Sequence, residues 1–247
     1  MINKIYTKVQ AILKHHYIRL FSYPSFDINE GIDYNDYWIK RRGTRGLLLG
    51  EPQKMRLDRL VEIIKGTPKI HSVVDVGGAD GSFVYFLKQK VAGITSICCV
   101  DSSEYALENA THYEIPNKLV DLSKKEQLEL IPEADLLYAL EVLEHIPNSE
   151  VLLREMYLKA KVMVVFSFPN TGFITYRIRL LLGKFPMQWV VHPTEHYRFW
   201  TVTDARWWLK AQGYKNYKVV PHRGIPVLNK IFPNLFSADI FVVLTKD

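Results

Sequence analysis

The sequence feature that most constrains the fold is an alternation of short apolar runs and helical segments that begins near residue 71. The apolar runs lie at residues 72–76, 94–100, 118–120, 134–140 and 162–168, and the helical segments between them at 82–89, 103–110, 124–130 and 150–160. Successive strands separated by helices need crossover connections, which produce a mainly parallel sheet. We therefore predict an α/β fold with helices on both faces of one sheet.

The segments on either side of this core follow other patterns. A helix is predicted at 203–211, and apolar runs at 217–220 and 239–244 follow with no full helix between them, which favours a closing antiparallel pair. Ahead of the first strand, residues 52–65 are predicted to form a helix that Gly66 and Pro68 end. We expect a helical extension or lid over residues 1–50 and a main domain over 51–247, with an insert at 171–200.

Composition limits the class of protein. With 247 residues, 48% of them hydrophobic, the chain can bury one sizeable core without disulfides. Cys98 and Cys99 are adjacent, so in a strand they face opposite ways and are expected to be packing residues in a reducing compartment. No apolar run reaches the roughly 18 residues of a membrane span, and no signal peptide opens the chain. We expect a cytoplasmic protein.

The charge and the N-terminus leave several partners open. The net charge of +6 suits nucleic acid, anionic lipid or an acidic small molecule, and it equally suits a soluble surface without such a partner. In the first 21 residues Ile2, Ile5 and Val9 recur at helical spacing, with most basic side chains off that stripe. Such a helix can lie on a membrane surface or pack as an arm on its own domain.

The clearest chemical signal is the loop after the first strand. The dinucleotide pattern G-x-G-x-x-G fits it in no register, whereas the pattern acid-x-G-x-G-x-G is met by Asp75, Gly77, Ala79 and Gly81, with Ala79 in place of the middle glycine. A strand that turns through glycines into a helix lets a ligand approach the backbone closely.

Two further acids follow the next two strands. Asp101 ends the second apolar run, where a carboxylate can accept hydrogen bonds from a ribose diol. Asp121 closes the third run. Because parallel strands present their carboxyl ends at one edge of a sheet, these acids and Asp75 are predicted to converge there.

These motifs resemble those of class I S-adenosylmethionine-dependent methyltransferases, and the similarity extends from about residue 37 to the C-terminus. The resemblance implies a Rossmann-like fold with a mainly parallel seven-stranded sheet and a closing antiparallel pair. It assigns Asp101 to the ribose of the cofactor, Asp121 to the adenine amino group and the next backbone amide to the ring. The implied cofactor residues are Asp75, Gly77, Gly78, Ala79, Gly81, Asp101, Ser102, Asp121, Leu122 and Glu141, with Tyr37 and Arg42 (or its neighbour Arg41) in an N-terminal lid.

A second resemblance concerns the end of the fourth strand. The segment E-V-L-E-H at 141–145, paired with H-x-x-x-H-x-x-x-W-T at 192–201, is similar to sequences of small-RNA terminal 2′-O-methyltransferases and ubiquinone-pathway O-methyltransferases. In those enzymes the residues matching Glu141, Glu144, His145 and His196 bind a divalent cation. Carboxylates suit Mg²⁺ or Mn²⁺, and imidazole shifts the preference toward Mn²⁺. In metal-free relatives with the same segment, Glu141 lines the cofactor site and His145 is a general base or a packing residue.

The acceptor is constrained mainly by what the chain lacks. It has no N-P-P-Y segment of an amino-group methylase, and its cysteines are not placed as the nucleophile of a C5-pyrimidine methylase, so an oxygen acceptor is favoured. The segments SFPNTGF at 167–173 and RIRLLLG at 177–183 resemble MetW-type sequences. We predict an S-adenosylmethionine-dependent methyltransferase that acts on the oxygen of a small molecule, with His145, His196 and His192 as candidate bases.

Three alternatives remain open. The insert at 171–200 is apolar, basic and aromatic, which suits an acceptor lid but also a lipid-linked acceptor at the membrane surface with peripheral membrane contact. RNA 2′-O-methylation is a second alternative, although the chain shows no added RNA-binding module and nucleic acid is not the expected partner. The third is a non-catalytic subunit that binds S-adenosylmethionine and regulates a partner.

Overall fold

A computed structural model describes residues 20, 34–42, 46–67, 70–186, 188 and 193–246. The helix predicted in the first 21 residues, except Leu20, and the candidate base His192 lie outside the described residues. The described part opens with helices α2 (Tyr34–Arg42) and α3 (Glu51–Lys65). Pro52 lies in the first turn of α3, where its missing N–H costs nothing, and Gly66 ends that helix as predicted.

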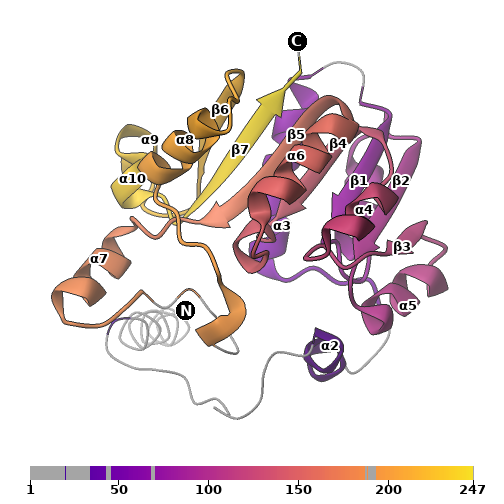
Figure 1. Cartoon of the computed structure of the whole chain (residues 1–247), viewed down its shortest axis with the longest axis horizontal. Coiled ribbons are helices and arrows are strands. Elements are labelled where there is room, and N and C mark those ends of the chain that lie inside the picture. The colour runs from indigo at the N-terminus through magenta and orange to yellow at the C-terminus, as the bar shows by residue number, and fades with distance from the viewer. Residues whose placement is uncertain are drawn as a thin grey trace, which may run out of the picture.

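The sheet has seven strands in the order β3-β2-β1-β4-β5-β7-β6 (Figure 1). They are β1 (Ser72–Val76), β2 (Ser96–Asp101), β3 (Asn117–Leu119), β4 (Ala134–Leu140), β5 (Ala160–Pro169), β6 (Tyr217–His222) and β7 (Asp239–Thr245). Strands β1 to β5 pair in parallel, whereas β7 lies antiparallel between β5 and β6. The predicted α/β class, the mainly parallel sheet and the antiparallel closure are therefore confirmed.

Four of the helices after β1 lie close to their predicted places, whereas the helix Ile174–Leu181 in the insert was not predicted and two further segments differ from the prediction. The helices after β1 are α4 (Ser82–Lys90), α5 (Glu104–His112), α6 (Ser149–Lys159), α7 (Ile174–Leu181), α8 (Val202–Ala211), α9 (Leu228–Ile231) and α10 (Pro233–Phe236). The segment predicted as a helix at 124–130 is a 3₁₀ helix at Lys125–Leu130, and the link between the closing strands contains the two single-turn helices α9 and α10. The capping pair Thr201 and Asp204 fixes the start of α8.

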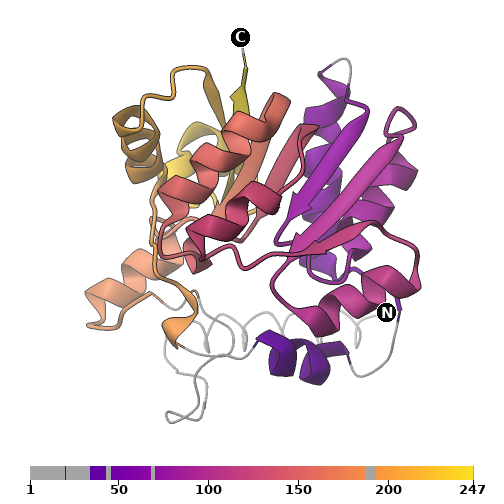
Figure 2. The same ribbon diagram turned by 45° about the vertical axis from the view of Figure 1, so that its right-hand side comes forward.

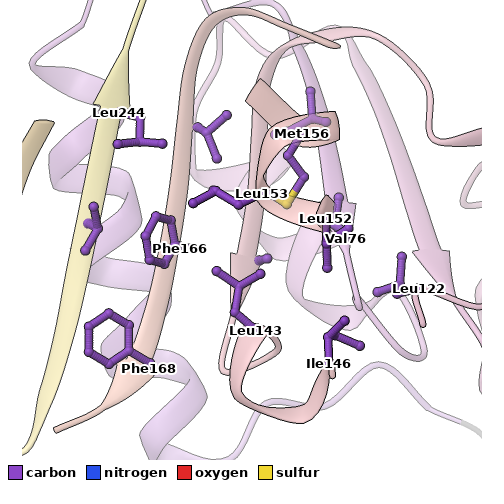
Figure 3. Close-up of a cluster of buried hydrophobic side chains, with 14 of the residues drawn as sticks. Val76, Leu122, Leu143, Ile146, Leu152, Leu153, Met156, Phe166, Phe168 and Leu244 are labelled. Atoms are coloured by element: carbon purple, nitrogen blue, oxygen red, sulfur yellow. The ribbon is translucent and has the colours of Figure 1, made fainter. Parts of the chain in front are cut away.

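The core is divided by the sheet into two apolar layers, because neighbouring residues of a strand face opposite ways. Val74 and Val76 of β1 belong to the layer under α6 and α8, which also contains Leu153 and Phe166 (Figure 3). Val73 belongs to the layer under α3, α4 and α5. Cys99 is fully buried and Cys98 is half-buried, and neither forms a disulfide, as the sequence predicted.

The ends of the antiparallel strands β6 and β7 lie at the carboxyl edge of the parallel strands. Asp239, which opens β7, pairs with Pro169 at the end of β5, and His222 at the end of β6 pairs with Asp239. The starts and ends of these antiparallel strands therefore lie at the same edge as the ends of β1 to β4. Within the described part of the chain, none of the helices has the length and hydropathy that crossing a bilayer requires.

Candidate active site

The loop that follows β1 needs glycine at three positions. Gly77 and Gly81 adopt φ values of +78° and +75°. A Cβ on Gly77 would lie 2.6 Å from Cγ2 of Val142, and one on Gly78 would lie 2.6 Å from Cγ of Asp75. The backbone of this loop is thus packed closely against its neighbours, and its glycines add no side chains that would keep a ligand from the backbone.

Ala79 takes the place of the middle glycine and connects the loop to the second strand. It adopts φ +53° in spite of its methyl group, and its N–H donates to Oδ2 of Asp101 at 2.8 Å. The N–H of Ser103 donates to Oδ1 of the same carboxylate at 2.9 Å. Burial raises the pKa of Asp101, and these amide hydrogen bonds partly offset the increase. Each carboxylate oxygen has a second lone pair, so the predicted contact with a ribose remains available.

Asp75 lies beneath the loop. It is 4% exposed, and burial raises the pKa of its carboxyl to about 8, with Tyr138 lowering it and Asp101 raising it. The group is therefore mainly protonated at neutral pH. It supports the loop from below, which makes its role in cofactor binding an indirect one.

The third predicted acid is engaged in its own turn. Oδ1 of Asp121 accepts from the N–H of Ser123 at 3.0 Å and from its hydroxyl at 2.6 Å, and Lys124 Nζ lies 3.3 Å from Oδ2. Partial burial raises the pKa of Asp121, but these partners outweigh it and the net pKa is lowered. The side chain of Leu122 is in the core (Figure 3), so this residue offers a ligand only its backbone.

Helix α2 packs against α5 at the cofactor edge (Figure 2). Oδ1 of Asn35 accepts from the hydroxyl of Ser103 at 2.8 Å and from the N–H of Tyr105 at 3.3 Å. The predicted lid residue Tyr37 lies in this helix, with its ring 6.4 Å from that of Tyr34. Arg42 ends the helix, and its side chain is outside the described part of the structure.

Tyr34 of α2 is a residue that no motif in the sequence marked. Partial burial, together with the negative charges of Glu195 and Asp101, raises the pKa of its hydroxyl to about 12. The side chain therefore lies within electrostatic range of the carboxylate predicted to bind the ribose and of the segment that carries His196. Asn35 was likewise not predicted as a site residue, because it belongs to a polar stretch without periodicity.

Glu141 lies apart from the other predicted metal ligands. It adopts φ +58°, its Oε1 accepts from the hydroxyl of Ser167 at 2.9 Å, and its Oε2 lies 3.0 Å from Nη2 of Arg56 on α3. Burial raises the pKa of its carboxyl, and Arg56 opposes that increase. The resemblance implied Glu141 as a ligand beside Glu144 and His145, but the 3₁₀ turn covers only Leu143–His145 and Glu141 precedes it.

Glu144, His145 and His196 do converge. One ligand atom from each lies within 4.8 Å of those of the others, and the two imidazole rings are 4.6 Å apart between centroids. Glu144 is 1% exposed, and among the described residues neither of its carboxylate oxygens has a hydrogen-bond partner. Nδ1 of His196 is likewise buried without a partner among them. Buried polar atoms are rarely left unpaired unless a ligand or water serves them.

Backbone contacts hold this cluster together. Nδ1 of His145 lies 2.7 Å from the carbonyl oxygen of Glu195, and the carbonyl oxygen of Glu144 accepts from the N–H of Tyr197 at 2.8 Å. Since a carbonyl can only accept, Nδ1 of His145 carries the proton and Nε2 has the free lone pair. This orientation is the one that a metal-binding or proton-accepting imidazole requires.

Burial sets the charge of the cluster. It lowers the pKa of His145, against the effect of the Glu195 carbonyl. Burial and the neighbouring His145 together lower the pKa of His196 to about 3. Burial raises the pKa of Glu144 well above the usual range, and Glu141 adds to that effect. Both imidazoles are therefore neutral at neutral pH, which is the form that binds cations.

The fold and this edge define a class of protein. A glycine loop at the end of β1 with a carboxylate at the end of β2 is the arrangement by which open α/β sheets bind nucleoside cofactors. Beside it lies a desolvated cluster of one carboxyl and two imidazoles. The protein thus combines an edge that fits a nucleoside cofactor with a buried cluster of one carboxyl and two imidazoles.

Comparison with known proteins identifies the class further. The family model described as a methyltransferase domain matches residues 40–219. No curated protein matches the chain. A SAM-dependent methyltransferase from Archaeoglobus fulgidus is similar in structure, with a TM-score of 0.59, 18% identity and coverage of 86% of this chain and 99% of that one.

Two other solved structures are similar. Magnesium protoporphyrin IX methyltransferase from Synechocystis, with bound SAH, gives a TM-score of 0.55 and 18% identity and covers 87% of this chain and 98% of that one. The small RNA methyltransferase HEN1 gives a TM-score of 0.58 and 21% identity, and the match covers 83% of this chain and 26% of that one. At these identities the structures show the shared fold. The chain belongs to the methyltransferase domain family and is a class I methyltransferase whose cofactor is S-adenosylmethionine.

Proposed function

We propose that the protein transfers the methyl group of S-adenosylmethionine to a hydroxyl of a small molecule, and that Glu144, His145 and His196 hold a divalent cation beside that hydroxyl. The observation that carries this proposal is the convergence of three side chains from two segments distant in sequence, with unpartnered buried atoms on Glu144 and His196. Two neutral imidazoles and one carboxylate suit Mn²⁺ better than Mg²⁺.

The chain's own groups fit such a reaction. Methyl transfer from a sulfonium is an in-line displacement with a neutral leaving group, so the protein mainly orients the acceptor and excludes water. The N–H groups of Gly77, Gly78, Ala79 and Gly81 already donate within the protein, so the 77–81 loop would line the cofactor site by close approach of its backbone, and α2 would cover it. When bound, a divalent cation lowers the pKa of a hydroxyl that coordinates it.

The neutral imidazoles favour this set over a simple general base, and Glu144, whose pKa is raised, would release its proton when a cation binds. A pKa of about 3 makes His196 a weak proton acceptor at neutral pH, but keeps it in the form that binds cations. Nε2 of His145 is the remaining candidate to accept a proton. Glu141 is not part of the proposed set, because it is paired with Arg56.

Transfer of a labelled methyl group from S-adenosylmethionine to a metabolite extract tests the proposal. We expect label in an extractable small molecule, and we expect His196→Ala to lose about 100-fold in turnover while its affinity for the cofactor changes little. His112→Ala on α5 is the matched control. Cofactor binding without any transfer would contradict catalysis, and equal loss of binding and turnover would make His196 a packing residue.

Calorimetric titration of Mn²⁺ into the protein tests the cation. Wild-type protein should bind one ion, Glu144→Ala should bind none, and Glu108→Ala, which removes an exposed carboxylate of α5, should bind like the wild type. Absence of heat at millimolar Mn²⁺ would remove the cation from the proposal and leave His145 as the base.

A terminal 2′-hydroxyl of RNA is the second candidate acceptor. It is supported by the cluster together with the structural similarity to HEN1, whose description is a small RNA methyltransferase. The same labelling experiment with total RNA in place of the extract separates the two. Label in RNA with none in small molecules would replace the first candidate by the second.

A further inference from the structure

Exposed apolar side chains gather on two segments that the proposed reaction does not use. Those of the first segment belong to the end of α7 and the turn after it, and those of the second to α9 and its flanks: Leu180, Leu181, Leu182 and Phe185, then Val227, Leu228, Ile231 and Phe232. We call these eight residues the apolar face. Leu181 is 86% exposed and Val227 67%. Exposed apolar groups of this size and number usually mark an interaction surface.

The two segments are joined at their bases. The side chain of Asn170, at the end of β5, donates to the carbonyl oxygens of Pro233 and Asn234 at 3.2 Å, and a Cβ on Gly172 would lie 2.6 Å from the carbonyl oxygen of Asn234. The start of α7 is thus held against α10. Both views show α7, α9 and α10 at the side of the molecule that carries β6 (Figures 1 and 2).

The charges around the apolar face have one sign. The sequence has no Asp or Glu from residue 171 to 194 or from 205 to 238. Arg177 and Lys230 are exposed within these stretches, and Lys184 is partly exposed. A second copy of this chain would bring equal charges together on contact, whereas a negatively charged surface would meet both the apolar and the basic groups favourably.

We propose that the apolar face docks on an anionic lipid bilayer. The leucine, isoleucine and phenylalanine side chains would enter the boundary between headgroups and acyl chains, and Arg177, Lys184 and Lys230 would meet the headgroups. Because α7 starts at the end of β5, docking would place the carboxyl edge of the sheet, with its reaction site, near the membrane surface. The docking itself does not depend on which acceptor the site uses.

Flotation with lipid vesicles tests the proposal. We expect wild-type protein to float with vesicles of equal parts phosphatidylglycerol and phosphatidylcholine. It should not float with vesicles of pure phosphatidylcholine, or with either kind of vesicle at high salt. Leu181→Asp and Ile231→Asp should each reduce vesicle binding about tenfold or more. The matched control is Leu158→Asp at the far end of α6, because Leu158 and Ile231 are both 59% exposed.

Two further measurements make each outcome decisive. Affinity for S-adenosylmethionine should be the same in all three variants, which shows that they fold and that docking is separate from the cofactor site. Wild-type protein that stays with the soluble fraction, or a control that loses vesicle binding as much as the two variants, would overturn the proposal. Sedimentation that shows a dimer dissociated by Leu181→Asp, without vesicle binding by the wild type, would assign the face to a second copy instead.

Discussion

The two halves of the site are stabilised in different ways. In the cofactor half, at the ends of β1 and β2, Asp101 accepts hydrogen bonds from the backbone of Ala79 and Ser103. In the reaction half, after β4, the buried oxygens of Glu144 and Nδ1 of His196 have no partner among the described residues. Asp101 thus has its hydrogen-bond partners before any ligand arrives, whereas Glu144 and His196 have buried atoms that a ligand could satisfy.

This difference has a physical meaning. Buried polar groups without partners lower stability, and they persist where binding or chemistry later uses them. Removing the carboxylate of Asp101 should therefore lower the free energy of unfolding, whereas removing the carboxyl of Glu144 should raise it. The following experiments test that contrast, beginning with the largest expected effect.

Gly77→Ala should weaken cofactor binding about a thousandfold, because the new Cβ would lie 2.6 Å from Val142 and shift the loop. Gly183→Ala is the matched control, since Gly183 has a similar φ of +71° but nothing within 4 Å of a Cβ. That control should cost about 1 kcal/mol of unfolding free energy and leave binding unchanged. Calorimetry and urea unfolding measure both effects. Equal effects on binding would mean that backbone strain, and not the packing of the loop, is decisive.

Arg56→Ala should lower the free energy of unfolding by about 3 kcal/mol, because it leaves the buried carboxyl of Glu141 without its counter-charge. Both side chains of this pair are 16% exposed. Arg59→Ala, which breaks the more exposed pair with Glu62 one turn further along α3, should cost less than about 1 kcal/mol. A similar cost for both variants in urea unfolding would show that the Arg56–Glu141 pair does not act as a buried pair.

Removing one carboxyl from each half should change stability in opposite directions. Asp101→Ala should lower the free energy of unfolding by about 1–3 kcal/mol, because two backbone N–H groups lose their acceptor. Glu144→Met should raise it by about 1–2 kcal/mol in protein free of metal and cofactor, because a buried unpaired carboxyl is replaced by an apolar side chain. Chemical unfolding under identical conditions measures the free energy of unfolding of both variants. A loss of stability in both would contradict the prediction.

Asp75 should make stability depend on pH. Its folded-state pKa of about 8 lies above its ordinary value near 4, so the stabilising effect is complete below pH 4 and is lost as the pH rises toward 8. Relative to Asp75→Asn, the wild type should lose about 1 kcal/mol between pH 6 and pH 7. Urea unfolding of both proteins at these pH values measures the difference. A constant difference across this range would show that the carboxyl ionises normally in the folded protein.

The sequence predicted the fold well, and it indicated which residues lie at the ends of β1 and β2, because both depend on local patterns. The bounds of β1 and β4 follow from continuous apolar runs, and Asp101 follows from its place at the end of such a run. The segment at 124–130 was harder to predict, because a 3₁₀ helix and an α-helix share similar sequence patterns over so few residues.

The reaction half depends on contacts between residues distant in sequence. Arg56 meets Glu141 across 85 positions of the chain, and no local pattern indicates that pairing. Glu141 has a left-handed backbone conformation and its carboxyl pairs with α3, although the resemblance implied that it would join Glu144 and His145. The same is true of Tyr34 and Asn35, whose roles depend on where α2 packs.

The most direct test of this account is the binding of S-adenosylmethionine measured by calorimetry and equilibrium dialysis. Folded wild-type protein should bind one molecule of the cofactor per chain, and Asp101→Ala should bind it at least about tenfold more weakly, because the ribose loses its carboxylate partner. If the folded wild type retains neither this compound nor S-adenosylhomocysteine, the assignment of the loop after β1 and of Asp101 to the cofactor is contradicted.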